Sequence, residues 1–184
     1  GRNGIIVRYA IDPLVEYNIA AYNSRYDKGH SFFNFNTIGC VVQYNEAYGN
    51  TSDDPDEVDR GGFDADYRSI NTTYQYNYSH DNHWFIAIQE KKLNKGVIIR
   101  YNVSVNEQLG AYMYGFPEFD DLEDLQIYNN THYFGEGKGT KMYIEAGKDR
   151  VPVESDYANN IFYFADEAEW FFDPDETCTT CTYK

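Results

Sequence analysis

The stretch TYQYNYSHDN, residues 73–82, carries the pattern that decides the fold, because four other segments align with it without gaps. All five lines share a Tyr column, then an Asn column, and a small residue two positions after the Asn. The segments are LVEYNIAAYN (14–23), VVQYNEAYGN (41–50), TYQYNYSHDN (73–82), IIRYNVSVNE (98–107) and LQIYNNTHYF (125–134). The Asn column is Asn18, Asn45, Asn77, Asn102 and Asn129, at spacings of 27, 32, 25 and 27 residues. Recurrence at such a period indicates a repeat architecture.

A second run of strand length lies between successive copies. These runs, rich in aromatic residues and isoleucine, are SFFNFNT, GGFDADY, HWFIAIQ, GAYMYGF and GTKMYIE, which begin at residues 31, 61, 83, 110 and 139. No stretch sustains an apolar 3.6-residue period with caps, so we expect no helix. The sequence therefore predicts an all-β solenoid of about five to six coils of ~27 residues, stacked as in a parallel β-helix.

The repeated columns have physical causes in such a coil. Asn suits a tight bend because it tolerates left-handed backbone geometry and its amide bonds to neighbouring backbone, so we predict an Asn ladder. Three of the five glycosylation sequons, at Asn77, Asn102 and Asn129, fall in the ladder column. We expect these three to carry no glycan, and we leave Asn50 and Asn71 as candidate acceptors.

With these columns in view, the chain resembles the right-handed parallel β-helix proteins of the pectate-lyase-like superfamily, over roughly residues 5–165. Its best-matching run is GGFDADYRSINTTYQYNYSHDN, residues 61–82. The resemblance implies a secreted, polysaccharide-active protein at the cell surface or outside the cell. Such proteins usually have more coils and a capping element, and the chain starts at Gly1 rather than Met. We therefore expect a single domain, 1–184, that is a fragment or a processed product.

Two segments depart from the coil pattern. Residues 50–62, NTSDDPDEVDRGG, read as an exposed acidic loop that accounts for the 32-residue spacing. Residues 166–184 read as an irregular C-terminal segment. It holds Cys178 and Cys181 in one CxxC, for which a zinc site, a local disulfide and an incomplete module stay open. Cys40 lies in an apolar run and is expected in the core.

Composition limits the partners. The 184 residues carry a net charge of -15, which argues against nucleic acid, because binding it requires Lys and Arg to replace phosphate counterions. No apolar run approaches the ~18–20 residues of a membrane span. Aromatic residues make up 18% of the chain, and tyrosine favours strands and surfaces that stack on sugars. We expect a polysaccharide as partner, with self-association or flanking domains at the open solenoid ends.

The leading candidate site is RGGFDADYR, residues 60–68. Asp64 and Asp66 are two apart in a predicted strand, so they share one face, and we expect that face to point outward with Asn34 and Asn36 of the preceding coil beside them. Paired carboxylates of this kind perform glycoside hydrolysis, one as acid and one as base. Together with the Asn amides they are also oxygen ligands for Ca²⁺. A polar ladder without chemistry is the third interpretation.

A second candidate is His80 with Asp81, which the column alignment places at the turn after the Asn ladder, with His132 in the His80 column. The lyase alternative, which the resemblance implies, needs a basic residue near a uronate carboxylate. For it, and for substrate binding, we single out cations on neighbouring coils and aromatic residues in the same columns. They are Arg60, Arg68, Lys91, Lys92 and Arg100, with Tyr67 and Trp84.

Three functions follow. The first is a carbohydrate-active enzyme, most simply a glycoside hydrolase and otherwise a polysaccharide lyase. The second is a non-catalytic glycan-binding solenoid of adhesin or tailspike type, and the third is a structural surface solenoid. A shared fold does not choose among them.

Overall fold

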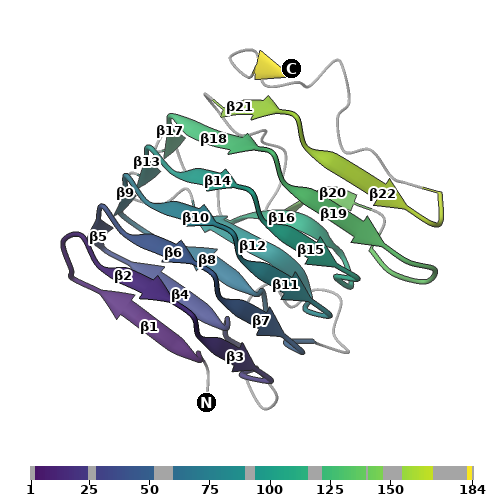
Figure 1. Ribbon diagram of the computed structural model, residues 1–184, viewed down its shortest axis with the longest axis horizontal. Helices are drawn as coiled ribbons and strands as arrows, with labels where there is room; N and C mark the ends of the chain where they lie inside the picture. The colour runs from purple at the N-terminus through teal and green to yellow at the C-terminus, as the bar shows by residue number, and fades with distance from the viewer. Residues whose placement is uncertain are drawn as a thin grey trace.

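The computed structural model describes residues 3–24, 28–51, 60–89, 94–115, 122–139, 141–146, 155–167 and 182–183. Within them every element is a β-strand, and the strands stack in parallel to form four sheets, here called A to D. One coil of chain passes through sheets A, B, C and D in turn, and equivalent strands of successive coils pair (Figure 1). The predicted all-β parallel solenoid is confirmed, with three strands and a short fourth in a typical coil.

The sheets have the following members. Sheet A contains β1 (Ile5–Arg8), β4 (Phe32–Phe35), β8 (Phe63–Ala65), β12 (Trp84–Gln89), β16 (Gly110–Gly115) and β20 (Lys141–Ala146). Sheet B contains β5 (Thr37–Ile38), β9 (Ser69–Ile70), β13 (Asn94–Lys95) and β17 (Leu122–Glu123). Sheet C contains β2 (Leu14–Glu16), β6 (Val41–Gln43), β10 (Thr73–Gln75), β14 (Ile98–Arg100), β18 (Leu125–Tyr128), β21 (Ser155–Ala158) and β23 (Thr182–Tyr183). Sheet D contains β3 (Ile19–Ala21), β7 (Glu46–Tyr48), β11 (Tyr78–His80), β15 (Val103–Val105), β19 (Thr131–Phe134) and β22 (Ile161–Phe164).

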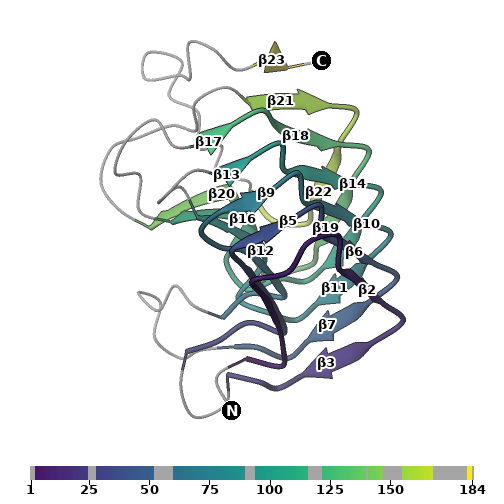
Figure 2. The same ribbon diagram turned by 90° about the vertical axis from the view of Figure 1, so that its left-hand side faces the viewer.

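The four sheets surround one interior, as the turned view shows (Figure 2). Alternate residues of each strand point inward. Phe32, Phe63 and Phe85 lie in the main apolar cluster, and the rings of Phe32 and Phe63 stack with centroids 5.0 Å apart. Cys40 is also fully buried in this core, as expected, and burial raises the pKa of its thiol to about 12.

Single residues with positive φ turn the chain at the corners. The corner between sheets C and D is formed on successive coils by Tyr17, Tyr44, Tyr76, Tyr101, Asn129 and Asn159, with φ between 54° and 57°. The corner after sheet D is formed by Tyr22, Gly49, Asp81 and Asn106, with φ between 53° and 73°. Left-handed geometry at every corner allows a sharp turn within one residue, but it strains a side chain as bulky as Tyr.

An Asn ladder follows the C–D corner. Asn45 shows its chemistry: its amide nitrogen Nδ2 donates to Asn77 Oδ1 at 3.2 Å and to the Val15 carbonyl at 2.9 Å, while its own Oδ1 accepts the backbone and side-chain N–H groups of Asn18. Each bond crosses from one coil to the next. The ladder is Asn18, Asn45, Asn77, Asn102, Asn130 and Asn160. Because these amides are engaged, the structure gives a reason for the predicted absence of glycan on Asn77 and Asn102.

The prediction that Asn129 is the fifth ladder residue is wrong by one position. Strand β18 contains four residues where β14 has three, and Tyr128 pairs with Arg100 instead of taking the corner. Asn129 therefore occupies the corner, and Asn130 accepts the Asn102 hydrogen bonds at 3.1 and 3.0 Å. The same shift moves His132 out of the His80 column.

A second ladder, which we did not predict from the sequence, follows the corner after sheet D. The backbone N–H of Asn23 donates to Asn50 Oδ1, that of Asn50 to Asn82 Oδ1, and that of Asn82 to Glu107 Oε2, at 2.9, 3.1 and 2.7 Å. Asn50 is fully buried in this ladder, so the expectation that it is a glycan acceptor is wrong. Asn71 lies at an exposed corner. A carboxyl group thus replaces an amide at the fourth rung of the second ladder.

The two segments outside the coil pattern are described only in part. Of the predicted loop 50–62, residues 52–59 lie outside the described residues, while Asn50, Gly61 and Gly62 at its ends are buried. In the segment 166–184, which we expected to be irregular, residues 182–183 form β23 on sheet C. Cys178 and Cys181 lie outside the described residues.

The first coil presents an open edge. Strands β1, β2 and β3 are end members of sheets A, C and D, and each pairs on one side. Large apolar side chains of this coil are 52–76% exposed: Ile6, Tyr9, Ile11, Leu14, Tyr17, Ile19 and Tyr22. Unpaired strands with exposed apolar side chains are a surface on which another chain can pair. Association at the solenoid ends therefore stays a prediction.

Candidate acid–base site

The structure places the predicted pair Asp64 and Asp66 away from solvent. Asp64 is 2% exposed and Asp66 is 8% exposed, so the outward face on which we expected them is not open to solvent. Asp64 does alternate with Phe63 and Ala65, which face the main core. The outer face of sheet A is nevertheless covered at this point, because Ala87, the Asp64 partner in β12, is fully buried in a second apolar cluster with Trp84 and Met113.

The expected cluster of Asp64 and Asp66 with Asn34 and Asn36 is also wrong in register by one residue. Asp64 pairs with Phe33, and Asn34 pairs with Ala65. Asn34 therefore shares the inner face, where its Nδ2 donates to Ser69 Oγ at 3.1 Å and its Oδ1 accepts from Thr37 Oγ1 at 2.8 Å. The strand SFFNFN thus buries its asparagine on the side opposite Asp64.

His30 is the side chain that meets Asp64. Its Nε2 lies 3.2 Å from Asp64 Oδ2, and both side chains are almost fully buried. The other ring nitrogen, Nδ1, accepts the backbone N–H of Gly61 at 3.1 Å, so the proton of a neutral ring sits on Nε2 and faces the carboxylate. Burial lowers the pKa of His30 to about 3. This pair is a neutral imidazole donating to a carboxylate inside the protein.

The other site residues predicted near sheet A make contacts that hold the local chain in place. Asp66 Oδ1 accepts the backbone N–H of Tyr67 at 2.7 Å, and the Tyr67 ring packs edge-on against Phe35. Trp84 is fully buried among the described residues, so its ring is not exposed to bind a substrate as we predicted. No group of three or more His, Cys, Asp or Glu side chains arranged to hold a metal occurs in the described part of the chain. The Ca²⁺ site stays a prediction to which this geometry adds nothing.

The predicted cations are not brought together. Arg60 donates through Nη1 to the carbonyls of Ser24 and Thr51 at 2.7 and 3.0 Å, which fixes a turn. Arg68 is an exposed corner residue between sheets A and B, with φ of 57°. Arg100 lies on the outer face of sheet C and bonds to Gln75. Lys91 and Lys92 lie outside the described residues. The described cations therefore do not form the basic patch that a lyase would need.

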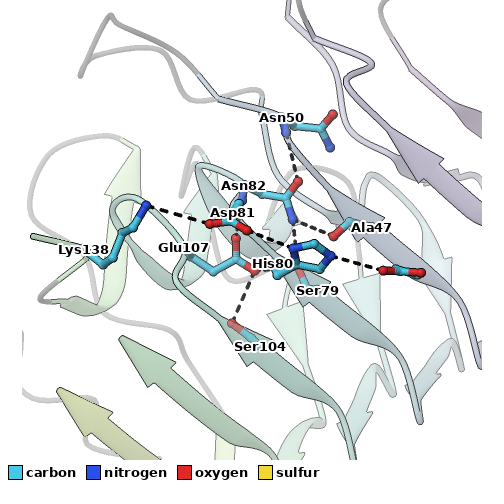
Figure 3. A network of polar contacts seen from close by, with 10 residues as sticks. Ala47, Asn50, Ser79, His80, Asp81, Asn82, Ser104, Glu107 and Lys138 are labelled. Carbon is cyan, nitrogen blue, oxygen red and sulfur yellow. Dashed lines mark hydrogen bonds and ion pairs between the residues drawn. The ribbon is translucent and has the colours of Figure 1, made fainter. Parts of the chain in front are cut away.

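The prediction of His80 with Asp81 leads instead to an accessible polar cluster on sheet D (Figure 3). His80 Nδ1 lies 2.9 Å from Asp81 Oδ2, and Nε2 lies 3.2 Å from Glu46 Oε1 on the preceding coil. Lys138 Nζ lies 3.8 Å from the other Asp81 oxygen. The His80, Glu46 and Asp81 side chains are 20%, 35% and 51% exposed. An imidazole is thus held between two carboxylates at the surface.

Both partners of His80 are carboxylates that accept hydrogen bonds, so the doubly protonated imidazolium is the form that satisfies both contacts. Burial lowers the pKa of His80, but the hydrogen bonds to Asp81 and Glu46 and their negative charges outweigh it, and the pKa is raised above its ordinary value. The ring is also stacked between two tyrosines, with centroids 4.8 Å from Tyr48 and 4.8 Å from Tyr78. The contacts hold the imidazolium in one position.

Glu107 anchors the chain on both sides of His80 and Asp81. Its Oε1 accepts from Ser79 Oγ at 2.5 Å and from Ser104 Oγ at 3.4 Å, and its Oε2 accepts the backbone N–H of Asn82 (Figure 3). It is fully buried, and burial raises its pKa to about 7 against the opposing effect of these donors and of His80. Glu107 therefore titrates near neutral pH beneath the surface cluster.

Three residues of these sites were missed from the sequence: His30, Glu46 and Glu107. For Glu107 the signal was present, since the last column of the five aligned segments reads Asn23, Asn50, Asn82, Glu107 and Phe134. For Glu46, the alignment placed it one coil before the His80 segment but gave no side-chain direction. His30 lies outside both repeated blocks, and nothing in its neighbours indicates that it meets Asp64.

Among the described residues, no helix has the length and apolar character needed to cross a membrane. No family model matches the chain, and no solved structure matches it. A lacto-N-biosidase of Bifidobacterium longum subsp. longum is 27% identical over 180 residues, an alignment that covers 88% of this chain. The chain resembles part of a glycosidase. It spans about a tenth of the length of that curated relative, so the activity of the relative comes to this chain only as a proposal.

Proposed function

We propose that this chain is a carbohydrate-active β-solenoid that hydrolyses a glycosidic bond of an extracellular glycan at Glu46, His80 and Asp81. The observation that carries the proposal is the surface imidazolium held between two carboxylates, 2.9 Å from one and 3.2 Å from the other. The likeness to a glycosidase supports the substrate class. Asp64 is less suited to the chemistry because it is buried against a neutral His30.

The proposed reaction uses a proton donor and a base that already touch. Water attacks the anomeric carbon as the bond from that carbon to the leaving oxygen breaks. Asp81 is 51% exposed, and when substrate binds its carboxylate turns from Nδ1 to the water and accepts a proton from it, because an inverting acid and base stand ~6.5–9.5 Å apart. His80 gives its Nδ1 proton to the leaving oxygen. Asp81 then returns a proton to Nδ1 across their 2.9 Å contact, which restores both groups. Glu46 keeps the ring cationic from the other side.

The electrostatics favour a neutral glycan. The net charge is -15, and two of the three proposed site residues are acidic. A polyuronate would be repelled unless cations screened both partners. This argues for hydrolysis of a neutral chain over elimination from an acidic one.

The test is release of reducing ends from a panel of neutral glycans, including lacto-series oligosaccharides because of the name of the relative. We expect Asp81→Asn and His80→Gln each to lower kcat/KM by about 100-fold or more, the usual contribution of an acid or base. Glu46→Gln lowers activity less and moves the alkaline limb of the pH profile to lower pH. Asp64→Asn is the matched control, and every such variant is checked for native folding by circular dichroism.

Two results contradict the proposal. Activity that survives Asp81→Asn but is lost in correctly folded Asp64→Asn returns the chemistry to the buried pair. Products that absorb as unsaturated uronates show a lyase.

A second candidate function is glycan binding without cleavage. It is favoured by the fact that both ring nitrogens of His80 are already bonded to carboxylates, so the cluster is also a stable platform. Binding to the panel with no product, unchanged in Asp81→Asn, establishes this alternative.

A further inference from the structure

We propose that the four tyrosines stacked at the C–D corner bind an extended neutral glycan that runs along the solenoid axis beside the Glu46–His80–Asp81 site. This tyrosine row is Tyr17, Tyr44, Tyr76 and Tyr101. The inference rests on the proposed function, because it names where the substrate chain lies.

The row is regular and accessible. Successive ring centroids are 5.2, 5.2 and 5.3 Å apart, and the planes are within 6–7° of parallel. The residues remain 42–73% exposed. Because neighbouring rings cover each other's faces, the groups available to a ligand are ring edges and a line of phenolic hydroxyls. A polymer lying along the axis meets the same group at every coil.

The corner itself does not require a ring. All four tyrosines have positive φ, which is strained for a bulky L-residue. Two later coils make the same corner with Asn129 and Asn159, residues that tolerate this conformation. Strained residues cluster at binding and catalytic sites, so four of them in one exposed row point to a role beyond the turn.

Polar side chains run beside the row, each one residue before a tyrosine. Gln43 Nε2 donates to Glu16 Oε2 at 2.7 Å, and Gln75 Nε2 donates to Gln43 Oε1 at 2.7 Å. Arg100 Nε donates to Gln75 Oε1 at 2.9 Å, and its Nη1 donates to Tyr128. Amide and guanidinium groups fixed in place beside aromatic rings offer both the donors and the acceptors that sugar hydroxyls need.

The row is continuous with the site. Glu46 follows Tyr44 by two residues, and Tyr78 and His80 follow Tyr76 by two and four. Strand alternation puts these side chains on the outer face of sheet D, since Ala47 and Ser79 between them are buried. Figure 1 shows sheets C and D side by side, so the tyrosine corner borders the face that carries His80. A glycan on the row therefore passes within reach of the proposed acid and base.

The experiment replaces Tyr44 and Tyr76 by asparagine, singly and together, because asparagine occupies the same corner in later coils. Tyr9→Asn is the control: Tyr9 is also exposed, with φ of 54°, but is not in the row. Binding is measured by affinity electrophoresis in soluble β-glucan, xylan and galactomannan. Kinetics are measured on short and long oligosaccharides of whichever glycan the wild type cleaves.

We expect each row substitution to weaken long-chain binding about threefold to tenfold, in line with the worth of an aromatic contact. KM for long chains rises by the same factor, while turnover of a disaccharide-sized substrate and the thermal midpoint stay close to wild type. If the double variant binds long chains with wild-type affinity, the tyrosine row does not bind the glycan, while the proposed hydrolysis is unaffected. Loss of binding in a protein that cleaves nothing supports the row and overturns the hydrolysis, and a wild type that binds no glycan overturns both.

Discussion

Two histidines in this solenoid each contact a carboxylate, and their environments shift their pKa values in opposite directions. His30 lies under sheet A, where one nitrogen accepts from a backbone N–H and the other faces Asp64. His80 lies on sheet D, where both nitrogens face carboxylates. The first ring is neutral because one partner is a donor and burial opposes charge. The pKa of the second ring is raised because both of its partners are carboxylates that accept its protons.

The difference shows that a His–Asp contact alone does not indicate chemistry. The pKa and the reactivity of the ring depend on its second hydrogen-bond partner and on the access of water. A neutral, buried ring stabilises the local structure, whereas an accessible ring can exchange protons with a ligand or with water.

The largest expected effect is loss of stability in acid from the buried rings. Burial lowers the pKa of both His30 and His132 to about 3. The unfolded chain takes up these protons near the ordinary pKa of ~6.5. The folded protein therefore keeps its full stability above pH ~6.5. It loses up to about 4 kcal/mol of the free energy of unfolding for each ring as pH falls toward 3. Urea unfolding between pH 7 and pH 4 measures it.

His30→Gln is the matched variant for this loss of stability in acid. A glutamine can accept from Gly61 and donate to Asp64 without titrating, so the fall in stability with acid becomes shallower by the His30 share. An unchanged slope in a folded His30→Gln protein would show that burial does not lower the pKa of His30. The same substitution at His80 cannot satisfy two carboxylates.

The next largest effect comes from removing one partner of each contact. Asp64→Ala leaves the buried His30 Nε2–H without this acceptor, and an unsatisfied buried donor costs about 1–3 kcal/mol. Asp81→Ala breaks a contact at a half-exposed carboxylate, which is worth at most about 1 kcal/mol. Thermal unfolding of both variants at pH 7 tests the ranking. Equal losses of stability would contradict this ranking, because the contact of Asp81 with His80 would then contribute as much as the buried contact of Asp64 with His30.

The fold was readable from the sequence because the corner and ladder columns repeat in register. Tyr and Asn recur together where the backbone must turn, and four of the five predicted ladder positions hold. The fifth failed at Asn129 and Asn130, where two adjacent asparagines satisfy the pattern equally and only the extra residue in β18 decides.

The site was less readable, because it depends on what covers each sheet. Alternation gave the correct direction for Asp64 relative to the core, but not the burial of the outer face around Ala87 and Met113. The His80 cluster depends on Glu46 from another coil, and its side-chain reach is not encoded in column position. Glu107 stood in an aligned column that reads Asn on the three preceding coils, so this first departure from the pattern marked the neighbourhood of the site.

A smaller effect is expected at Glu107. Burial raises its pKa to about 7, from an ordinary value of about 4.5. The stabilisation of its protonated form is complete below the ordinary value and is lost as pH rises through about 7, the reverse of the two buried histidines. Glu107→Gln retains an acceptor for the Asn82 N–H and cannot ionise. We expect it to be more stable than wild type at pH 8 by about 2 kcal/mol, with little difference at pH 5.

Chemical denaturation at both pH values gives the answer for Glu107. If the two proteins respond identically to pH, the buried carboxyl does not change its protonation in this range. Glu107→Ala is the companion variant, because it also abolishes the charge but leaves the Asn82 N–H without its acceptor. It should be destabilised at both pH values.

The smallest effect, and the one that bears most directly on the contrast, is the titration of His80 itself. Its folded pKa is raised, so the contact with Asp81 and Glu46 stabilises the protein fully below pH ~6.5 and fades as pH rises through the folded value. The energy is below about 1 kcal/mol because the site is partly open. Proton NMR resolves it where stability does not: the His80 ring signals titrate above pH 6.5, while those of His30 do not move between pH 5 and 8. Asp81→Asn and Glu46→Gln each lower the His80 midpoint, since each removes a charge that holds the proton. A His80 midpoint below 6.5 in the wild type would remove the proton donor from the proposed reaction at neutral pH, and a His30 signal that titrates beside it would erase the difference between the two rings.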